Sequence, residues 1–248
     1  MSVYLHQVRI EQRVFWRNRE SAVFIFIFPI LLFLLLGAVY DKPIEGHKAA
    51  NVLLAGMMGY GVANTAFSGI AIQLVVRREA GILKRLRSTP LPPRAYLAAV
   101  LTSTLVVFAL QTVALFVIGK ALFGTRGPHH LAALLPVLLL GVATFAGLGL
   151  AAASLIRSAD GASAIVTVIL LPMAFLSGSF GSTRRYPAFL RAIGDVLPLR
   201  HFIRALEHVY LDGAALWSRP WSLAVMAAWA AVGLAVAARY FGWEPRER

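Results

Sequence analysis

The sequence contains no cysteine and few charged residues: only 14% of its 248 residues are Asp, Glu, Lys or Arg. Without cysteine the chain has no disulfides, no thiolate catalysis and no cysteine-based metal site. A soluble domain has about 25% charged residues. Together with a hydrophobic content of 59%, the low charge indicates a protein that crosses a membrane several times.

Several chemical signatures are also missing. The G-x-x-x-x-G-K-[ST] loop that binds nucleotide phosphates does not occur. No Asp, Glu, Lys or Arg lies in the central part of a long apolar run, whereas proton- or sodium-coupled carriers usually need such buried groups. A hydrolase within the membrane would need a set of acid, base and nucleophile that the runs do not offer. We therefore expect neither catalysis nor a cofactor in this chain.

The distribution of basic residues argues against two further functions. The net charge is +13, but the basic residues are scattered between apolar runs, as membrane topology requires, and form no single basic face for nucleic acid. All six histidines lie outside the apolar runs, and the adjacent His129 and His130 have no acidic partner nearby. We predict neither nucleic-acid binding nor a metal site.

Six long apolar runs predict an all-α integral membrane fold with six transmembrane helices in one domain, residues 1–248. A helix of about 20 residues crosses the roughly 30 Å hydrocarbon core of a bilayer. The predicted spans are about Ser21–Tyr40, Val52–Val76, Ala95–Gly119, Leu131–Ile156, a fifth that begins near Ala162, and Trp221–Phe241. We expect Pro29 to kink the first span and Pro172 to interrupt the fifth. The second span is rich in small residues, which allow close helix packing.

Residues 1–20 predict an amphipathic helix on the inner membrane surface rather than a signal peptide. Leu5, Val8, Gln12 and Phe15 recur at helical spacing among arginines, and no apolar core precedes a cleavage site. A solvated tail is the alternative. Because Lys and Arg are retained in the cytoplasm, this segment and the basic loop 77–94 place both chain ends on the cytoplasmic side. Arg246 and Arg248 fit that orientation.

The loop 77–94, with the sequence RREAGILKRLRSTPLPPR, joins the second and third spans. We predict a short helix at the membrane surface that offers positive charge to a soluble partner. Its expected apolar face consists of Ile82, Leu83 and Leu86, and its expected polar face of Arg78, Lys84, Arg85 and Arg87. Pro90, Pro92 and Pro93 should end this helix.

Residues 181–220 are rich in arginine although the span count places them outside the cell. We predict a re-entrant hairpin of two short helices broken at Pro198, because the segment has too few apolar residues for a span. Two series of apolar residues should pack on the bundle: Phe189, Leu190, Ile193 and Leu197, then Phe202, Leu206, Val209 and Tyr210. Opposite charges should pair within each helix, Arg191 with Asp195 and Arg204 with Glu207.

Two functions are open for this hairpin. Its charges either only keep the hairpin at the level of the lipid headgroups, or the hairpin forms an outer gate with Phe175 and Phe180 beneath it.

Three motifs in register resemble the ABC-2-type permeases. The stretch from Glu79 to Leu91 is similar to the family's E-x-G-[TI]-[LM]-[KE]-x-L-[RK]-x-[TS]-P-[LMV] run between the second and third spans. Leu171–Gly178 (LPMAFLSG) resembles its L-P-x-x-F-L-S-G motif at the end of the fifth span. Leu197, Pro198 and Leu199 resemble its L-P-[LF] motif before the last span. Ala80 departs from the family pattern, because many drug-transporting relatives have Arg there.

The resemblance implies a permease half that forms a dimer with an identical or paralogous permease and recruits two copies of an ABC ATPase. ATP and Mg²⁺ would be bound by that partner and not by this chain. The matched coupling residues are Glu79, Gly81, Leu83, Lys84, Arg85, Leu86 and Arg87. Of these, we expect the charged residues to face the ATPase, and Leu83 and Leu86 to seat the helix.

The polar residues within the spans are candidates for a translocation path. They are Asn64, Thr65 and Ser68 on the second span and Thr167 and Ser177 on the fifth, next to Phe175. Ser and Thr in membranes also hydrogen-bond to their own or a neighbouring helix, which is the structural alternative. An amide such as that of Asn64 cannot be satisfied by its own helix alone, so it should face a partner span or a cavity. The resemblance adds that the second and fifth spans line the central path of the dimer.

The function expected from the resemblance is export, across a bacterial cell membrane, of an amphipathic drug, as in antibiotic efflux, or of a lipid-like compound. Two alternatives are open: export of a polysaccharide or lipid-linked glycan, and a membrane scaffold subunit without a transport path of its own.

Overall fold

The computed structural model describes residues 3–89, 91–128 and 131–244. The predictions for Pro90, His129, His130, Arg246 and Arg248 fall outside these residues. Within them the secondary structure is helical, with one isolated bridge between Ile44 and His47 and no named strand. The predicted all-α fold is confirmed.

Six helical stretches are long and apolar enough to cross a membrane, as predicted. They are Arg19–Val39 (α2 Arg19–Ala22, the π-helical turn η1 Val23–Ile27 and α3 Phe28–Val39), Ala49–Glu79 (α4 Ala49–Val62, the π-helical η2 Ala63–Gly69 and α5 Ile70–Glu79), α7 Pro93–Phe123, α8 Leu131–Leu155, α9 Ala159–Ser177 and α12 Pro220–Tyr240. Four shorter elements complete the described chain: α1 Val3–Arg17, α6 Ile82–Arg87, α10 Ala188–Val196 and α11 Pro198–Tyr210, followed by a 3-10 turn (η3) at Leu216–Ser218.

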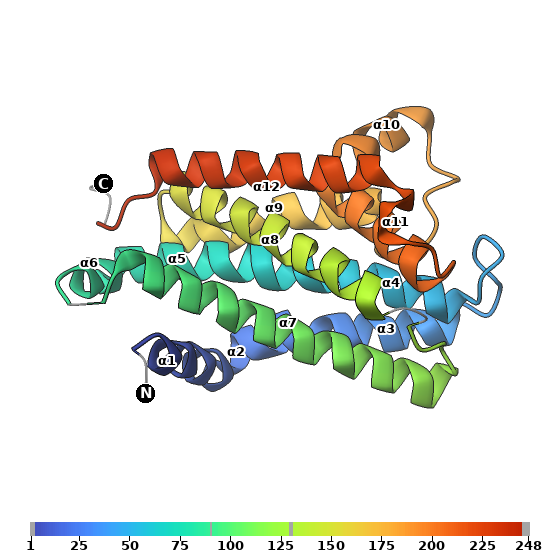
Figure 1. The fold of residues 1–248 in the computed structure, drawn as a ribbon, viewed down its shortest axis with the longest axis horizontal. Helices are drawn as coiled ribbons and strands as arrows, with labels where there is room; N and C mark the ends of the chain where they lie inside the picture. The colour runs from blue at the N-terminus through green and yellow to red at the C-terminus, as the bar shows by residue number, and fades with distance from the viewer. Residues whose placement is uncertain (1–2, 90, 129–130, 245–248) are drawn as a thin grey trace.

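The long helices run side by side along the longest axis of the molecule (Figure 1). α1, α6 and both chain ends lie at one end of the bundle, which we call the α6 end, whereas α10 and α11 lie toward the other, the α10 end. The stretch Ala49–Glu79 is central: 72% of its most apolar window is buried, against 17% for Arg19–Val39. It contacts α7, α8, α9 and α11.

Small residues allow this centre to pack closely. A Cβ atom added to Gly149 of α8 would lie 2.6 Å from the carbonyl oxygen of Ala66, so the two helices meet backbone to backbone. A Cβ atom on Gly233 of α12 would lie 2.6 Å from the carbonyl carbon of Gly147. In lipid there is no hydrophobic driving force for helix association, so close packing of this kind stabilises the bundle instead.

Pro172 does not interrupt the fifth span, contrary to the prediction. α9 continues through Pro172 to Ser177 and ends only at Gly178, whose φ of +90° is the left-handed conformation that favours glycine at a helix end. Pro172 lies on an exposed face of α9. A proline on such a face is tolerated in a membrane helix more readily than in a soluble one.

The break between α10 and α11 at Pro198 is confirmed, since Leu197 has extended backbone (φ −75°, ψ 134°). The apolar face of α11 is buried as predicted, with Phe202 and Leu206 in the core. The face of α10 is not, because Phe189 is 63% exposed. The predicted packing of α10 on the bundle is therefore wrong for this side chain.

The predicted ion pairs of this segment are replaced by pairs across the break. The carboxylate of Asp195 lies 3.3 Å from Arg200 and 2.9 Å from Arg204, and not beside Arg191 on its own helix. The reason is geometric: the extended Leu197 turns the first turns of α11 back toward the end of α10.

Candidate functional site

The candidate site is α6, the short helix between the second and third spans. α5 ends at Glu79, and Gly81 adopts φ +68°, a left-handed conformation that glycine takes at little cost. The hydroxyl groups of Ser88 and Thr89 then donate to the carbonyl oxygens of Arg85 (2.8 Å) and Leu86 (2.6 Å) and end α6 after one and a half turns. The local sequence thus folds this loop into a helix of six residues.

The two faces of α6 differ in chemistry. Leu83 is fully buried and Leu86 packs against the core, whereas Lys84, Arg85 and Arg87 are exposed. These placements agree with the orientation predicted for those side chains. Ile82, however, is 42% exposed and does not belong to the buried face. The surface of α6 therefore combines three cations with one apolar side chain.

The sequence predicted Arg78 on the polar face of α6. In the structure it is buried at the end of α5. Its guanidinium donates to the carbonyl oxygens of Ala153 (2.8 Å) and Ile156 (2.5 Å). Ala153 lies in the last turn of α8 and Ile156 directly follows the helix, so neither carbonyl has a partner within α8. Arg78 thus caps α8 with a positive charge at the negative end of the helix dipole.

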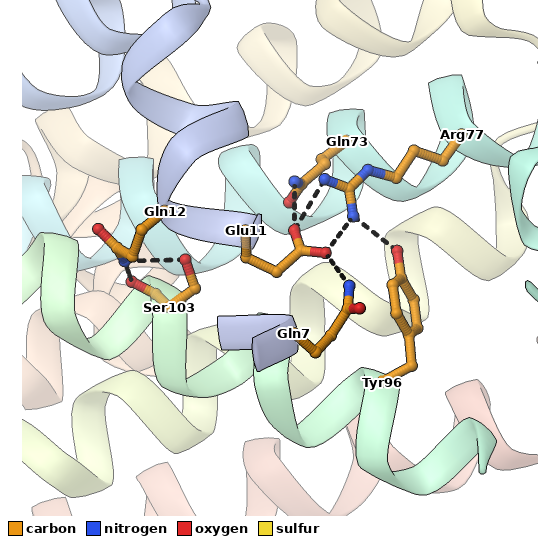
Figure 2. Close-up of polar contacts among 7 residues, drawn as sticks. All are labelled: Gln7, Glu11, Gln12, Gln73, Arg77, Tyr96 and Ser103. Atoms are coloured by element: carbon orange, nitrogen blue, oxygen red, sulfur yellow. Dashed lines mark hydrogen bonds and ion pairs between the residues drawn. The ribbon is translucent and has the colours of Figure 1, made fainter. Parts of the chain in front are cut away.

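Arg77 turns in another direction and pairs with the amphipathic helix α1 (Figure 2). Its guanidinium binds both oxygens of Glu11, at 2.9 and 2.7 Å, and also donates to the hydroxyl of Tyr96 at 2.7 Å. Gln7 and Gln73 donate to the same carboxylate at 2.9 and 3.2 Å. Glu11 is only 2% exposed, so this is a buried ion pair whose remaining hydrogen-bonding capacity is satisfied.

A second set of contacts holds α1 against α7. The Gln12 amide donates to the carbonyl oxygen and the hydroxyl of Ser103, at 2.8 and 2.9 Å, as Figure 2 also shows. The hydroxyls of Tyr4 and Thr102 share a hydrogen bond of 2.6 Å. The inward face of α1 is therefore polar. The apolar stripe from which we predicted this helix is partly exposed, at Leu5.

Sequence reasoning missed the pairing of Arg77 with Glu11 and placed Arg78 on the wrong helix. One signal was present: Glu11 is an acid in a helix that is otherwise basic, and buried arginines need a partner. In the structure the two arginines that lead into α6 connect it with α1, α7 and α8. A displacement of α6 would therefore act on several helices at once.

Asn64, predicted for the translocation path, faces a partner span. Its amide donates to the carbonyl oxygen of Phe24 at 2.7 Å, and Gln111 of α7 donates to Ile25 and Phe26 at 2.8 and 3.0 Å. Pro29 explains this arrangement, because it has no N–H group for the carbonyls four and five residues earlier. The first span contains the π-helical turn η1 shortly before Pro29, and the expected kink at Pro29 stays a prediction.

The other predicted path residues fall into two groups. Thr65, Ser68 and Ser177 are buried, and their hydroxyl oxygens have no hydrogen-bond partner among the described residues. Thr167 and Phe175 lie on the exposed face of α9, and the Phe175 ring is 4.6 Å from that of Phe180. The structure of the single chain does not gather the six residues into one cavity.

No group of three His, Asp or Glu side chains that could hold a metal ion occurs in residues 3–89, 91–128 and 131–244.

Comparison with known proteins agrees with this geometry. Residues 6–211 match the family described as "ABC-2 type transporter". A protein of Escherichia coli strain K12 named "Probable multidrug ABC transporter permease YbhR" is 26% identical over 161 residues, which is 64% of this chain and 44% of that protein. The protein of the same name from Escherichia coli O157:H7 matches equally. The chain thus spans less than half the length of these relatives.

Proposed function

Because this chain belongs to the ABC-2 type transporter family, we propose that it is the membrane subunit of an ABC exporter, driven through α6 by a separate ATPase. The cargo is an amphipathic drug or lipid-like compound that leaves the cytoplasm. The name of the Escherichia coli relatives, a multidrug permease, supports that class of cargo. ATP and Mg²⁺ are bound by the ATPase.

The observation that carries this proposal is the surface of α6 and its attachment. Lys84, Arg85 and Arg87 are free to meet a partner, while Leu83 and the flanking Arg77 are buried in contacts with the rest of the chain. A helix that presents charge outward and is fixed inward can receive a displacement and pass it to the spans. We assign Glu79 and Gly81 to the same coupling element, Gly81 because its left-handed backbone sets the angle between α5 and α6.

An exposed face of α9 supports the assembly that we propose. α9 exposes an apolar strip that includes Val168, Ile169 and Phe175. A second permease, identical or paralogous, would cover this strip, and the path for cargo would run between the two copies next to Thr167. Each copy recruits one ATPase. α6 and both chain ends then lie in the cytoplasm of a bacterial cell, with α10 and α11 outside.

The test is a triple replacement of Lys84, Arg85 and Arg87 by Ala, with the ATPase co-expressed. Single exposed pairs contribute only about 0–1 kcal/mol each, so the three are changed together. We expect the ATPase to copurify less well and cargo export to fall to background, while the melting temperature of the permease stays unchanged. Export and ATP hydrolysis are measured in the same vesicles.

A control variant removes the same charge elsewhere. Arg185, Arg191 and Arg219 are exposed at the α10 end, and their replacement by Ala should leave ATPase binding intact. Normal export by the α6 triple variant, with an unchanged rate of ATP hydrolysis, would show that α6 is not the coupling element.

A further inference from the structure

A polar pocket of about 210 Å³ lies at the α10 end of the bundle, far from α6. It is formed by the turn before α4, the residues that follow α7 and the end of α11 (Figure 1). Its lining residues are Gly46, His47, Lys48, Asn51, Gly124, Arg126, Tyr210 and Leu211. None of these is acidic, and two of them are permanent cations.

The two cations are held in different ways. The Lys48 ammonium donates to the carbonyl oxygens of Phe123 (2.5 Å) and Gly124 (3.5 Å), which fixes it at the end of α7. Arg126 is fixed by its backbone instead: its N–H donates to Asn51 (3.1 Å), and its carbonyl accepts from the Tyr210 hydroxyl (2.7 Å). Its side chain is exposed and its guanidinium has no partner among the described residues, so the fork of donors is free to meet an anion that enters the pocket.

The carboxylate of Asp212 contacts two histidines. Asp212 lies beside the pocket, but one of its oxygens is 2.8 Å from His208 and the other is 3.5 Å from His47. The two histidines therefore occupy both oxygens of Asp212. Neither Lys48 nor Arg126 forms an ion pair with a carboxylate in the part of the chain that the structure describes.

Asn51 supplies an independent indication of a ligand. It is 5% exposed, and its side-chain oxygen accepts from both the Arg126 N–H and the Tyr210 hydroxyl. Its amide nitrogen has no acceptor among residues 3–89, 91–128 and 131–244. Asn51 lines the pocket, so an acceptor bound there would satisfy this nitrogen. α4 also begins just after Lys48 without a side-chain cap, so the positive end of its dipole adds to the field.

We propose that this pocket binds an anion of the phosphate type, held by the Arg126 guanidinium, the Lys48 ammonium and the Asn51 amide. A planar guanidinium fork and an ammonium group are the side chains that recognise phosphate oxygens best. A purely structural role would account for Lys48, which caps α7, but not for Arg126 and the Asn51 donor. The anion is either a free phosphate or the phosphate of a lipid headgroup, and the site does not depend on what the chain transports.

The test compares Arg126→Ala with Arg185→Ala in the full-length chain. Arg185 is exposed at the same end but does not line the pocket, so both variants lose one charge. In the first arm, inorganic phosphate is titrated calorimetrically at low ionic strength against protein in phosphatidylcholine nanodiscs. Loss of one charge-assisted contact should raise the Kd by about tenfold for Arg126→Ala and by less than about twofold for the control. Arg126→Lys should give an intermediate value, because it keeps the charge but loses the fork.

In the second arm, nanodiscs contain phosphatidylcholine and phosphatidylglycerol, and native mass spectrometry counts the anionic lipids retained by the protein. Weaker titration alone identifies a soluble anion, and weaker lipid retention identifies a headgroup phosphate. If Arg126→Ala equals the control in both arms, the proposal is overturned. Should Arg126→Ala lower the melting temperature without ligand, Arg126→Gln replaces it and is judged by the same two measurements.

Discussion

Arg77 and Arg78 are neighbours in the chain but bind opposite parts of the molecule, and both are needed where the second span leaves the bundle. Arg78 caps α8, and Arg77 pairs with Glu11 of α1. A buried ion pair adds little net stability compared with apolar residues of the same size, but its loss on one side leaves an uncompensated charge. These residues therefore contribute more to the relative placement of the helices than to the net stability of the fold.

Replacing Glu11 by Ala should lower the free energy of unfolding by about 3–5 kcal/mol, because Arg77 would stay buried without its counterion. The measurement is a denaturant titration in micelles, together with proteolysis of α1. Glu20→Ala is the control, since that acid is exposed on α2. The double variant Glu11→Leu with Arg77→Met should recover most of the loss. A loss as large in the double variant would mean that packing, and not charge, is responsible.

Glu207 on α11 is the acid at the α10 end whose environment departs most from water. The pKa of its carboxyl is raised from 4.5 to about 7, mainly because burial disfavours the charged form. The carboxylates of Glu45 and Asp212 contribute to this rise, and Arg204 and Arg219 oppose it. Because the folded pKa is above the unfolded value, the folded chain holds this proton more tightly. Stability from this group is complete below about pH 4.5 and is lost as the pH rises through about 7.

We therefore expect the melting temperature to fall between about pH 5 and pH 8, with a change in the free energy of unfolding of up to about 3 kcal/mol. Glu207→Gln should remove this part of the pH dependence and raise the melting temperature at the higher pH. The same scan on Glu20→Gln provides the control. An unchanged pH profile in Glu207→Gln would show that another group titrates.

At the scale of elements, the first span depends on neighbouring helices for hydrogen bonds to some of its backbone carbonyls. Pro29 cannot donate to Ile25 or Phe24, and the amides of Gln111 and Asn64 take over from α7 and η2. An unsatisfied carbonyl in a membrane cannot turn to water. The amide side chains within the spans thus have a structural role that is separate from contact with cargo.

Gln111→Leu should therefore cost about 1–3 kcal/mol of unfolding free energy, since it leaves the Ile25 carbonyl without a donor. Adding Pro29→Ala should recover part of this cost, because residue 29 would then have an N–H group to donate. Thr112→Val on the same helix is the control: that hydroxyl is buried and has no hydrogen-bond partner among the described residues. Additive costs for Gln111→Leu and Pro29→Ala in a double-mutant cycle would contradict this account.

The elements that the sequence predicted best are the membrane-spanning helices. Each span was predicted from its own apolar run, because a bilayer imposes a length and a composition on every helix that crosses it. α6 was predicted from charge and from Pro92 and Pro93. Apart from Pro172, which does not interrupt α9, the errors concern contacts between elements: Arg78 was assigned to the wrong helix, Ile82 to the wrong face, and Asp195 to the wrong partner. Such contacts depend on how helices from distant parts of the chain approach one another, and no local pattern in the sequence encodes that approach.

At the scale of the whole molecule, the α6 end differs from the α10 end in which charges are exposed. α6 presents Lys84, Arg85 and Arg87, and α1 presents Arg13 and further arginines nearby. The arginines of the α10 end are partly neutralised, as Asp195 pairs with two of them and Glu45 with Arg184 at 3.0 Å. Early segments usually set the orientation of a membrane protein, and the basic residues of α1 and α6 both lie at the α6 end. This favours the α6 end as the inner one, although arginines are numerous at both.

This orientation can be tested with single cysteines, because the chain contains none of its own. Ser88 follows α6 and Ser182 precedes α10, and both are exposed. In intact cells, Ser182→Cys should react with a membrane-impermeant maleimide, and Ser88→Cys should react only after the membrane is permeabilised. The wild-type chain gives the background. Labelling of Ser88→Cys in intact cells would invert the topology, and α6 could then not meet an ATPase in the cytoplasm. The pocket of Lys48 and Arg126 would in that case open to the cytoplasm and its phosphate-type anion would come from there.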